Sequence, residues 1–397
     1  MRDGPWLAVA IYAIGFFSLS LEPMFGLLIP LWALHLQASV LLVGVIVGGS
    51  AFLPSVFSIP MGALADRIGA KTLLLYAGAG TAVCTALYPL WTNPWGLLAL
   101  HMIVGSLQSL VWISAQAYVA KLGTDQQRSH LMGNFSSATT LGAFAGPLVV
   151  GYLLDGWGFS VTFFAASLWA LMVTLMAFHL SPSGPRTPLA WSHLRPSLRD
   201  FQQAASLCAI PTVLFVIVGT FLRVSTYAIR GSYYPVYLKG IGFSAFSIGL
   251  LNSINNLVSS FSALFVGRLS QRIQPSLLLL FGLSLAIVTL ALTPAFSSFR
   301  PLLLLTVLSG SGVGQTLPLL LSILANVTGP EIRGLSAGLR TTANRLASLL
   351  VPIFLGLIIQ NFGLATGFYL IGLLLMLAVG ALFVYVQGSY LNASERR

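Results

Sequence analysis

Twelve apolar segments, each of about twenty residues or more, follow one another along this chain of 397 residues. Only 7% of the residues are charged, whereas about 25% is usual in soluble domains. Because an open strand would leave its backbone groups unpaired in lipid, such segments predict membrane-spanning helices. The expected spans are roughly 6–34, 40–65, 72–91, 95–119, 131–154, 160–180, 209–238, 243–267, 276–296, 301–325, 335–360 and 364–387.

Landmark residues of the first half return in the second half at a constant spacing of 205 residues, without a gap. Gly62 returns as Gly267, and Pro147 returns as Pro352. One spacing accounts for glycines, prolines and arginines alike, which indicates a duplicated half. A membrane protein built from two similar halves commonly places its binding site between them.

The fold class that follows is an all-α membrane protein with twelve transmembrane helices in two pseudo-symmetric six-helix halves. We expect the halves to cover residues 1–180 and 209–397. Residues 181–208 join them. Because this segment opens with a helix-breaking Ser-Pro-Ser-Gly-Pro run and carries several arginines, we expect it to be a cytoplasmic linker.

The net charge of +11 does not indicate a nucleic-acid partner, because of where the charges lie. Lysine and arginine concentrate in alternate connections and at the C-terminus, while the intervening connections carry almost none. This asymmetry follows the positive-inside rule, and it predicts that both termini lie in the cytoplasm. We expect the chain to lie in a bacterial inner membrane. Cys84 and Cys208 lie in or beside apolar segments, so we expect free thiols.

The connection between the second and third spans reads GALADRIGAK, from Gly62 to Lys71. It resembles the signature loop of the major facilitator superfamily, G-x-L-a-D-R-x-G-r-K, and departs from it only at Ala70. The resemblance implies the major facilitator fold and a breakable latch between the halves on the cytoplasmic side. The residues of this predicted cytoplasmic gate are Gly62, Asp66, Arg67, Gly69, Lys71 and Arg128, with Gly267, Arg272 and Arg333 in the repeat copy.

A second motif lies in the fifth span. Gly142, Gly146, Pro147 and Gly151 resemble the fifth-helix motif of drug/proton antiporters, a branch of the same superfamily. That motif usually has two glycines after the proline, and Val150 replaces the first of them. Packing of neighbouring helices is the role that small residues at this spacing favour.

Glu22 is the one acid that these spans place inside the membrane. An ionised carboxylate at bilayer depth costs several kcal/mol on most scales, and protonation would remove much of that cost. Glu22 is therefore a candidate proton carrier, and a structural ion pair with a buried arginine is the alternative. His101 stands where the superfamily branch expects an arginine, four residues before Gly105, and is a candidate for sharing protons with Glu22.

Arg223, Tyr227 and Arg230 lie at helical spacing on one face of the seventh span, and Tyr234 extends that face. In the repeat register Tyr227 corresponds to Glu22, so the two residues are expected to line one substrate cavity from opposite halves. The other candidates for that cavity are Arg345, Asn252, Asn256, Gln108 and Gln315, for which hydrogen bonds between helices are an equally good interpretation.

No zinc-type histidine pair, phosphate-binding glycine loop or paired intramembrane acids occur, so we expect no enzyme, cofactor or metal site. We expect a monomeric secondary transporter that works by alternating access in the lipid bilayer. The preferred hypothesis is a proton-coupled exporter of small organic or amphipathic molecules. One alternative is a carrier of an organic anion, such as a carboxylate metabolite or siderophore, that uses the intramembrane arginines. Another is a non-transporting membrane protein that only binds a partner or a ligand.

Overall fold

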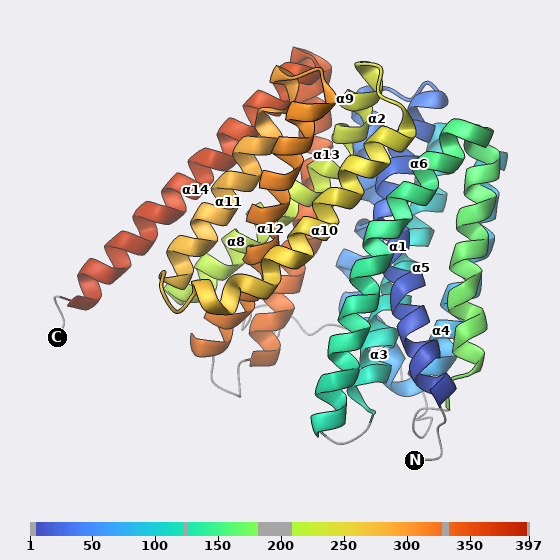
Figure 1. Cartoon of the computed structure of the whole chain (residues 1–397), viewed down its shortest axis with the longest axis horizontal. Coiled ribbons are helices and arrows are strands. Elements are labelled where there is room, and N and C mark those ends of the chain that lie inside the picture. The colour runs from blue at the N-terminus through green and yellow to red at the C-terminus, as the bar shows by residue number, and fades with distance from the viewer. Residues whose placement is uncertain (1–4, 123–124, 182–208, 328–332, 395–397) are drawn as a thin grey trace. The chain divides into compact units, whose positions relative to one another are not determined.

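The computed structural model describes residues 5–122, 125–181, 209–327 and 333–394, and every regular element within them is helical (Figure 1). The first-half elements are α1 (Pro5–His35), α2 (Val40–Gly49), α3 (Phe52–Ile68), α4 (Ala70–Leu87), η1 (Tyr88–Leu90), α5 (Pro94–Ala120) and α6 (Asp125–Phe178). The second-half elements are α8 (Pro211–Arg230), α9 (Tyr233–Gly240), α10 (Ala245–Leu269), α11 (Pro275–Ala291), η3 (Thr293–Ala295), α12 (Phe299–Val327), α13 (Arg333–Phe362) and α14 (Leu364–Ser394).

Each of the twelve predicted spans lies on helix, which confirms the predicted fold class. Ten helices of the described ranges are long and apolar enough to cross a membrane. The count differs from twelve for two reasons. α6 contains two predicted spans, because Gly158, with φ 74° and ψ −175°, breaks it into the two limbs visible in Figure 1. α11 is apolar but has only 17 residues.

The backbone repeats with the same spacing of 205 residues that the sequence shows. The two 3₁₀ helices, η1 and η3, begin at Tyr88 and Thr293. Left-handed φ angles also recur in register, at Gln37 and Gly242 (57° and 92°) and at Gly158 and Gly363 (74° and 87°). These positions are the turns between helices, so the duplication extends to the way the chain reverses direction.

One difference between the repeats has a simple cause. The second predicted span is interrupted at Ser50 and Ala51, between α2 and α3, whereas its counterpart α10 is continuous. Pro54 has no N–H to donate to the carbonyl of Ser50, while the residue in the same register of α10 is Ser259. The missing hydrogen bond favours the break in the first half only.

Two compact units make up the chain. Unit 1 is Met1–Pro196 together with Leu238–Ser253, and unit 2 is Ser197–Tyr237 together with Ile254–Arg397. The start of α10 therefore packs with the first half of the sequence. The predicted domain boundaries at 180 and 209 remain a prediction, and most of the predicted linker lies outside the described residues.

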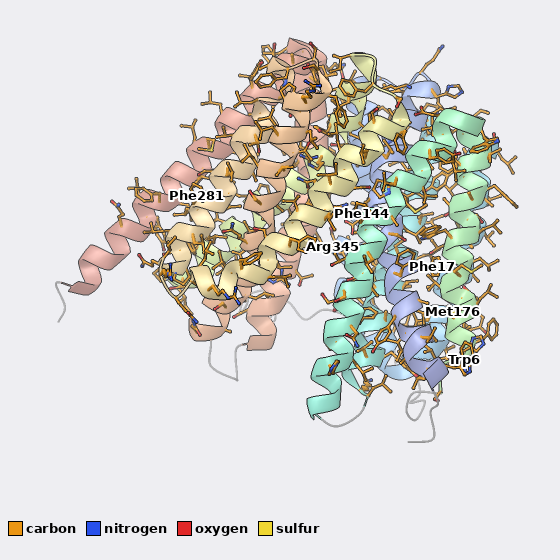
Figure 2. All side chains as sticks on the ribbon, viewed as in Figure 1. Trp6, Phe17, Phe144, Met176, Phe281 and Arg345 are labelled. Atoms are coloured by element: carbon orange, nitrogen blue, oxygen red, sulfur yellow. The ribbon has the colours of Figure 1, made fainter. Side chains whose placement is uncertain are left out.

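The core of unit 1 joins α1, α4, α5 and α6. Ile14, Leu74, Val111 and Phe135 are almost fully buried in it, and Phe17 and Met176 pack against its edge (Figure 2). In unit 2, α11 and α12 approach closely at Gly282 and Gly312, where a Cβ atom on either glycine would lie 2.7 or 2.5 Å from the carbonyl oxygen of the other. Small residues thus set the helix spacing, as membrane bundles require.

Candidate functional site

Glu22 lies near the middle of α1 and its side chain is exposed. α1 turns its other face to α6, since a Cβ on Gly146 would lie 2.6 Å from the carbonyl oxygen of Ser20. Glu22 follows Ser20 by two positions, which on a helix is a rotation of about 200°, so Glu22 points away from that contact. Pro23 lies within the same helix and leaves the carbonyl of Leu19 without its helical donor. Within the described part of unit 1, Glu22 forms no hydrogen bond or ion pair.

His101 has a partner that the sequence did not predict. Its Nδ1 lies 2.8 Å from the hydroxyl of Tyr88, and both residues are buried. η1 presents Tyr88 to this position, and the rings of Phe25 and Phe163 pack against the tyrosine. His101 is thus enclosed by aromatic rings, and Tyr88 is its hydrogen-bonding partner. Exchange of a proton between His101 and Glu22 remains a prediction.

The predicted connection between the second and third spans is shorter than expected. α3 continues to Ile68 and α4 begins at Ala70, so Gly69, with φ 91°, is the single residue between them. Lys71 lies in the first turn of α4 and donates hydrogen bonds to the carbonyls of Phe178 (3.0 Å) and Leu180. Its positive charge therefore stabilises the C-terminal end of α6.

Most residues of the predicted cytoplasmic gate are described by their backbone alone. For Gly62, Asp66, Arg67, Arg128 and Arg333 the structure describes only the helical backbone. Gly267 and Arg272 are exposed at the end of α10 and just beyond it. The gate remains a prediction.

The fifth-helix motif packs α6 against two other helices. A Cβ on Gly142 would lie 2.1 Å from the carbonyl oxygen of Phe16 in α1. On the α10 side, a Cβ on Gly151 would lie 2.5 Å from the carbonyl oxygen of Ala245, and one on Gly249 would lie 2.2 Å from that of Pro147. The glycines of this motif, for which the sequence predicts a packing role, therefore lie where helices approach closely.

Asp155 strengthens the same contact between α6 and α10, and the sequence analysis did not select it. Its carboxylate oxygens accept hydrogen bonds from the backbone N–H groups of Ala245 (2.9 Å) and Phe246 (2.8 Å). The hydroxyl of Ser244 accepts from the following N–H group, that of Ser247, at 3.1 Å. These bonds satisfy the free donors at the start of α10. Asp155 follows Gly151 by one helical turn, so both residues lie on the face of α6 that contacts the start of α10. That spacing is the feature of the sequence that could have indicated Asp155.

In unit 2 the predicted arginines lie over tyrosine rings. The Cζ atom of Arg223 is 4.9 Å from the centroid of Tyr227, and that of Arg230 is 4.5 Å from the centroid of Tyr234. Tyr234 is buried, and its hydroxyl lies 3.2 Å from the hydroxyl of Thr306. The predicted face thus continues from α8 into α9, with each cation stabilised by the electron-rich face of a ring.

A third arginine, Arg340, lies on α13, a helix that packs against α8, the helix of Arg223. The Nε atom of each is buried, and neither has a hydrogen-bonding partner among the described residues. Arg345 lies five residues further along α13 and is half-buried (Figure 2).

The neutral polar candidates divide between the units. Asn252 is buried in unit 1, and Asn256 is half-buried in unit 2. Gln108 buries its Nε2 atom and Gln315 buries its Oε1 atom, in each case without a partner in the described ranges. The amide nitrogen of Gln315 donates to the carbonyl of Ser311 at 3.1 Å. Unsatisfied amide atoms of this kind are suited to a polar ligand.

Residues 6–299 and 215–395 match the sequence model of the Major Facilitator Superfamily. The chain belongs to this superfamily. It is therefore a secondary transporter and not an enzyme, and it is an integral membrane protein with many apolar helices. Over 326 residues it is 28% identical to the Multidrug resistance protein MdtG of Proteus mirabilis (strain HI4320), which covers 80% of this chain and 79% of the relative.

Solved structures of the superfamily share the fold at low sequence identity. The nucleoside transporter NupG aligns with a TM-score of 0.82 at 14% identity, over 96% of this chain and 99% of NupG. A bacterial homologue of the human lysosomal transporter Spinster, in an inward-facing and occupied conformation, aligns with a TM-score of 0.78 at 15% identity. That alignment covers 97% of this chain and 98% of the homologue. At these identities the likeness shows the major facilitator fold alone.

Proposed function

We propose that this superfamily member exports small organic or amphipathic molecules in exchange for protons, by alternating access. The observation that carries the proposal is Glu22, an exposed carboxyl group near the middle of a membrane-spanning helix, with no partner in the described part of unit 1. The distant MdtG relatives, which are named for multidrug resistance, support export. The fifth-helix motif, which resembles that of drug/proton antiporters, supports it too.

The physical reason for the coupling is the cost of a charge in lipid. A carboxylate near the membrane centre is unfavourable, and the neutral acid is not. When the site opens to the outside, Glu22 would bind a proton and the substrate would leave the protein. It would then lose the proton when the site opens to the cytoplasm. The proton and the substrate therefore bind alternately within one conformational cycle.

A proteoliposome assay tests the coupling. A pH gradient should drive accumulation of a fluorescent drug substrate by the natural protein, and Glu22→Gln should abolish the pH-driven part of the flux. Glu22→Asp keeps an ionisable carboxyl and should retain it in part. The proposal is wrong if flux neither responds to the gradient nor changes in Glu22→Gln.

We also propose that the protein acts as a monomer in the bacterial inner membrane, with both termini and the linker in the cytoplasm. The asymmetry of lysine and arginine between alternate connections supports this orientation. A reporter fused to either terminus, active only in the cytoplasm, checks it. The predicted alternative, carriage of an organic anion, would depend on the arginines of unit 2 instead of Glu22.

A further inference from the structure

A groove of about 320 Å³ lies on the surface of unit 2, between α11 and α14. The two helices pack together, and residues at a spacing of three and four positions on each of them form the walls. The lining residues are Leu277, Leu280, Phe281 and Ser284 of α11 and Met376, Val379, Gly380 and Phe383 of α14. Ser284 is the only polar residue among them, so the groove suits an apolar molecule.

The groove lies beside a point where the two helices touch. A Cβ atom on Gly372 of α14 would lie 2.3 Å from the Cβ atom of Ala291 of α11. About two helical turns further along α14, by contrast, no atom lies within 4 Å of a Cβ added to Gly380. Gly380 therefore leaves open a space that a larger side chain would fill.

The corresponding helices of unit 1, α4 and the second limb of α6, differ at two positions of the repeat register. Leu175 stands where unit 2 has Gly380, and Gly78 stands where unit 2 has Leu283. A Cβ on Gly78 would lie 2.6 Å from Oγ1 of Thr174, so α4 and α6 approach closely there, whereas Leu283 is fully buried. A leucine within the helix contact and a glycine beside it therefore favour a wider gap in unit 2.

The groove opens onto a surface that hydrocarbon solvates. The sequences of α11 and α14 contain no charged residue. Large apolar side chains on the same helices are exposed, among them Phe281 (Figure 2) and Leu377, each with 62% of its surface. Because the chain spans a membrane, such a surface meets the acyl chains of lipids. An empty groove there would leave its walls without contacting atoms, so a hydrocarbon chain in it is favoured.

We propose that this groove binds one acyl chain of a membrane phospholipid and retains it longer than the chains of the surrounding lipid. Within a bilayer there is no hydrophobic driving force between apolar groups, so contact area and shape decide which chain stays. The walls of the groove contact a chain from two helices, whereas the exposed face of a single helix contacts it from one. The lining residues carry no charge, so binding should not depend on the charge of the headgroup.

Photo-crosslinking tests the proposal. The purified protein in detergent is incubated with a phosphatidylcholine that carries a diazirine in one acyl chain, washed with lipid-free detergent and irradiated. Mass spectrometry of the peptides should find the label on residues 277–284 and 376–383, whereas the other exposed faces should lose the lipid in the wash. A phosphatidylglycerol with the same acyl chains should label the same peptides equally.

Two variants fill the groove from opposite walls. Gly380→Leu introduces the residue type that unit 1 has at the equivalent position, and the added Cβ meets no atom within 4 Å. Ser284→Leu adds bulk from α11. Each variant should lose the retained label. Ala381→Leu is the matched control, because Ala381 is exposed on α14 and does not line the groove, and it should be labelled as the natural protein is.

Three results would overturn the proposal. The first is that the natural protein retains no label after the wash, or that Gly380→Leu and Ser284→Leu are labelled as strongly as Ala381→Leu. The second is that a fluorescent drug substrate displaces the lipid and added phospholipid does not, which would assign the groove to a transported molecule. The third is a dimer of the natural protein in native mass spectrometry that Gly380→Leu separates into monomers, which would assign the groove to a second copy. Crosslinking requires no transport, so its outcome does not depend on the proposed proton coupling.

Discussion

The two units share a backbone plan but differ in how they use charge. In unit 1 an acid caps a helix, since Asp155 accepts from the start of α10, and a second acid, Glu22, is exposed on α1. In unit 2 the described helices contain no acid, and Arg223 and Arg230 lie over tyrosine rings. Duplication thus preserved turns and helix contacts, while the side chains at equivalent positions acquired different chemistry. The proposed proton carrier, Glu22, belongs to unit 1.

The largest effect is expected where this difference is sharpest, at the equivalent positions Glu22 and Tyr227. Glu22→Gln should abolish the pH-driven part of the flux, because an amide cannot carry the proton. Tyr227→Phe should keep it, because the aromatic face that Arg223 contacts is retained. Flux into proteoliposomes with and without a pH gradient measures both. Loss of coupling in Tyr227→Phe but not in Glu22→Gln would reverse the assignment of the halves.

The next effect compares two equivalent glycines. A Cβ on Gly105 would lie 2.1 Å from the carbonyl oxygen of Ser50, and one on Gly310 would lie 2.7 Å from that of Asn255. The backbone must move to make room for either Cβ atom, and it must move further for Gly105 than for Gly310. Gly105→Ala should therefore destabilise the protein by about 3 kcal/mol and Gly310→Ala by roughly 1 kcal/mol, within the usual range for overpacking.

Thermal unfolding in detergent, followed by tryptophan fluorescence, checks this order. Gly133→Ala is the matched control, because no atom lies within 4 Å of the added Cβ. Similar melting temperatures for Gly105→Ala and Gly133→Ala would show that α5 is free to move away from Ser50.

The helices and the repeat could be predicted from the sequence because they depend on the length and spacing of apolar segments. The packing role of Gly142, Gly146 and Gly151 followed from residue size in the same way. The partner of His101 could not be predicted, because Tyr88 reaches it only through the short helix η1. The packing of α8 against α13 could not be predicted either, because no local pattern reports which helices contact each other.

Asp155 gives a smaller effect that tests the asymmetry in helix capping. Asp155→Ala leaves the N–H groups of Ala245 and Phe246 without their acceptor, and should cost about 1–2 kcal/mol, the range for loss of a helix cap. The equivalent residue in the repeat is Gln360, which is exposed, and Gln360→Ala should change stability by less than about 0.5 kcal/mol. Equal melting temperatures for the two variants would contradict a capping role for Asp155.

The smallest effect compares Lys71 with its repeat counterpart, Ser276. Lys71 donates to the carbonyls at the end of α6, so Lys71→Met should lower stability by roughly 0.5–1 kcal/mol, as expected for a charge at a helix terminus. Ser276 buries its hydroxyl without a hydrogen bond among the described residues, so Ser276→Ala should be neutral or slightly stabilising. Melting curves at low and high salt separate the two, because salt screens only the lysine's contribution. A destabilised Ser276→Ala would mean that its hydroxyl has an acceptor, and the same register would then carry a stabilising polar contact in both units.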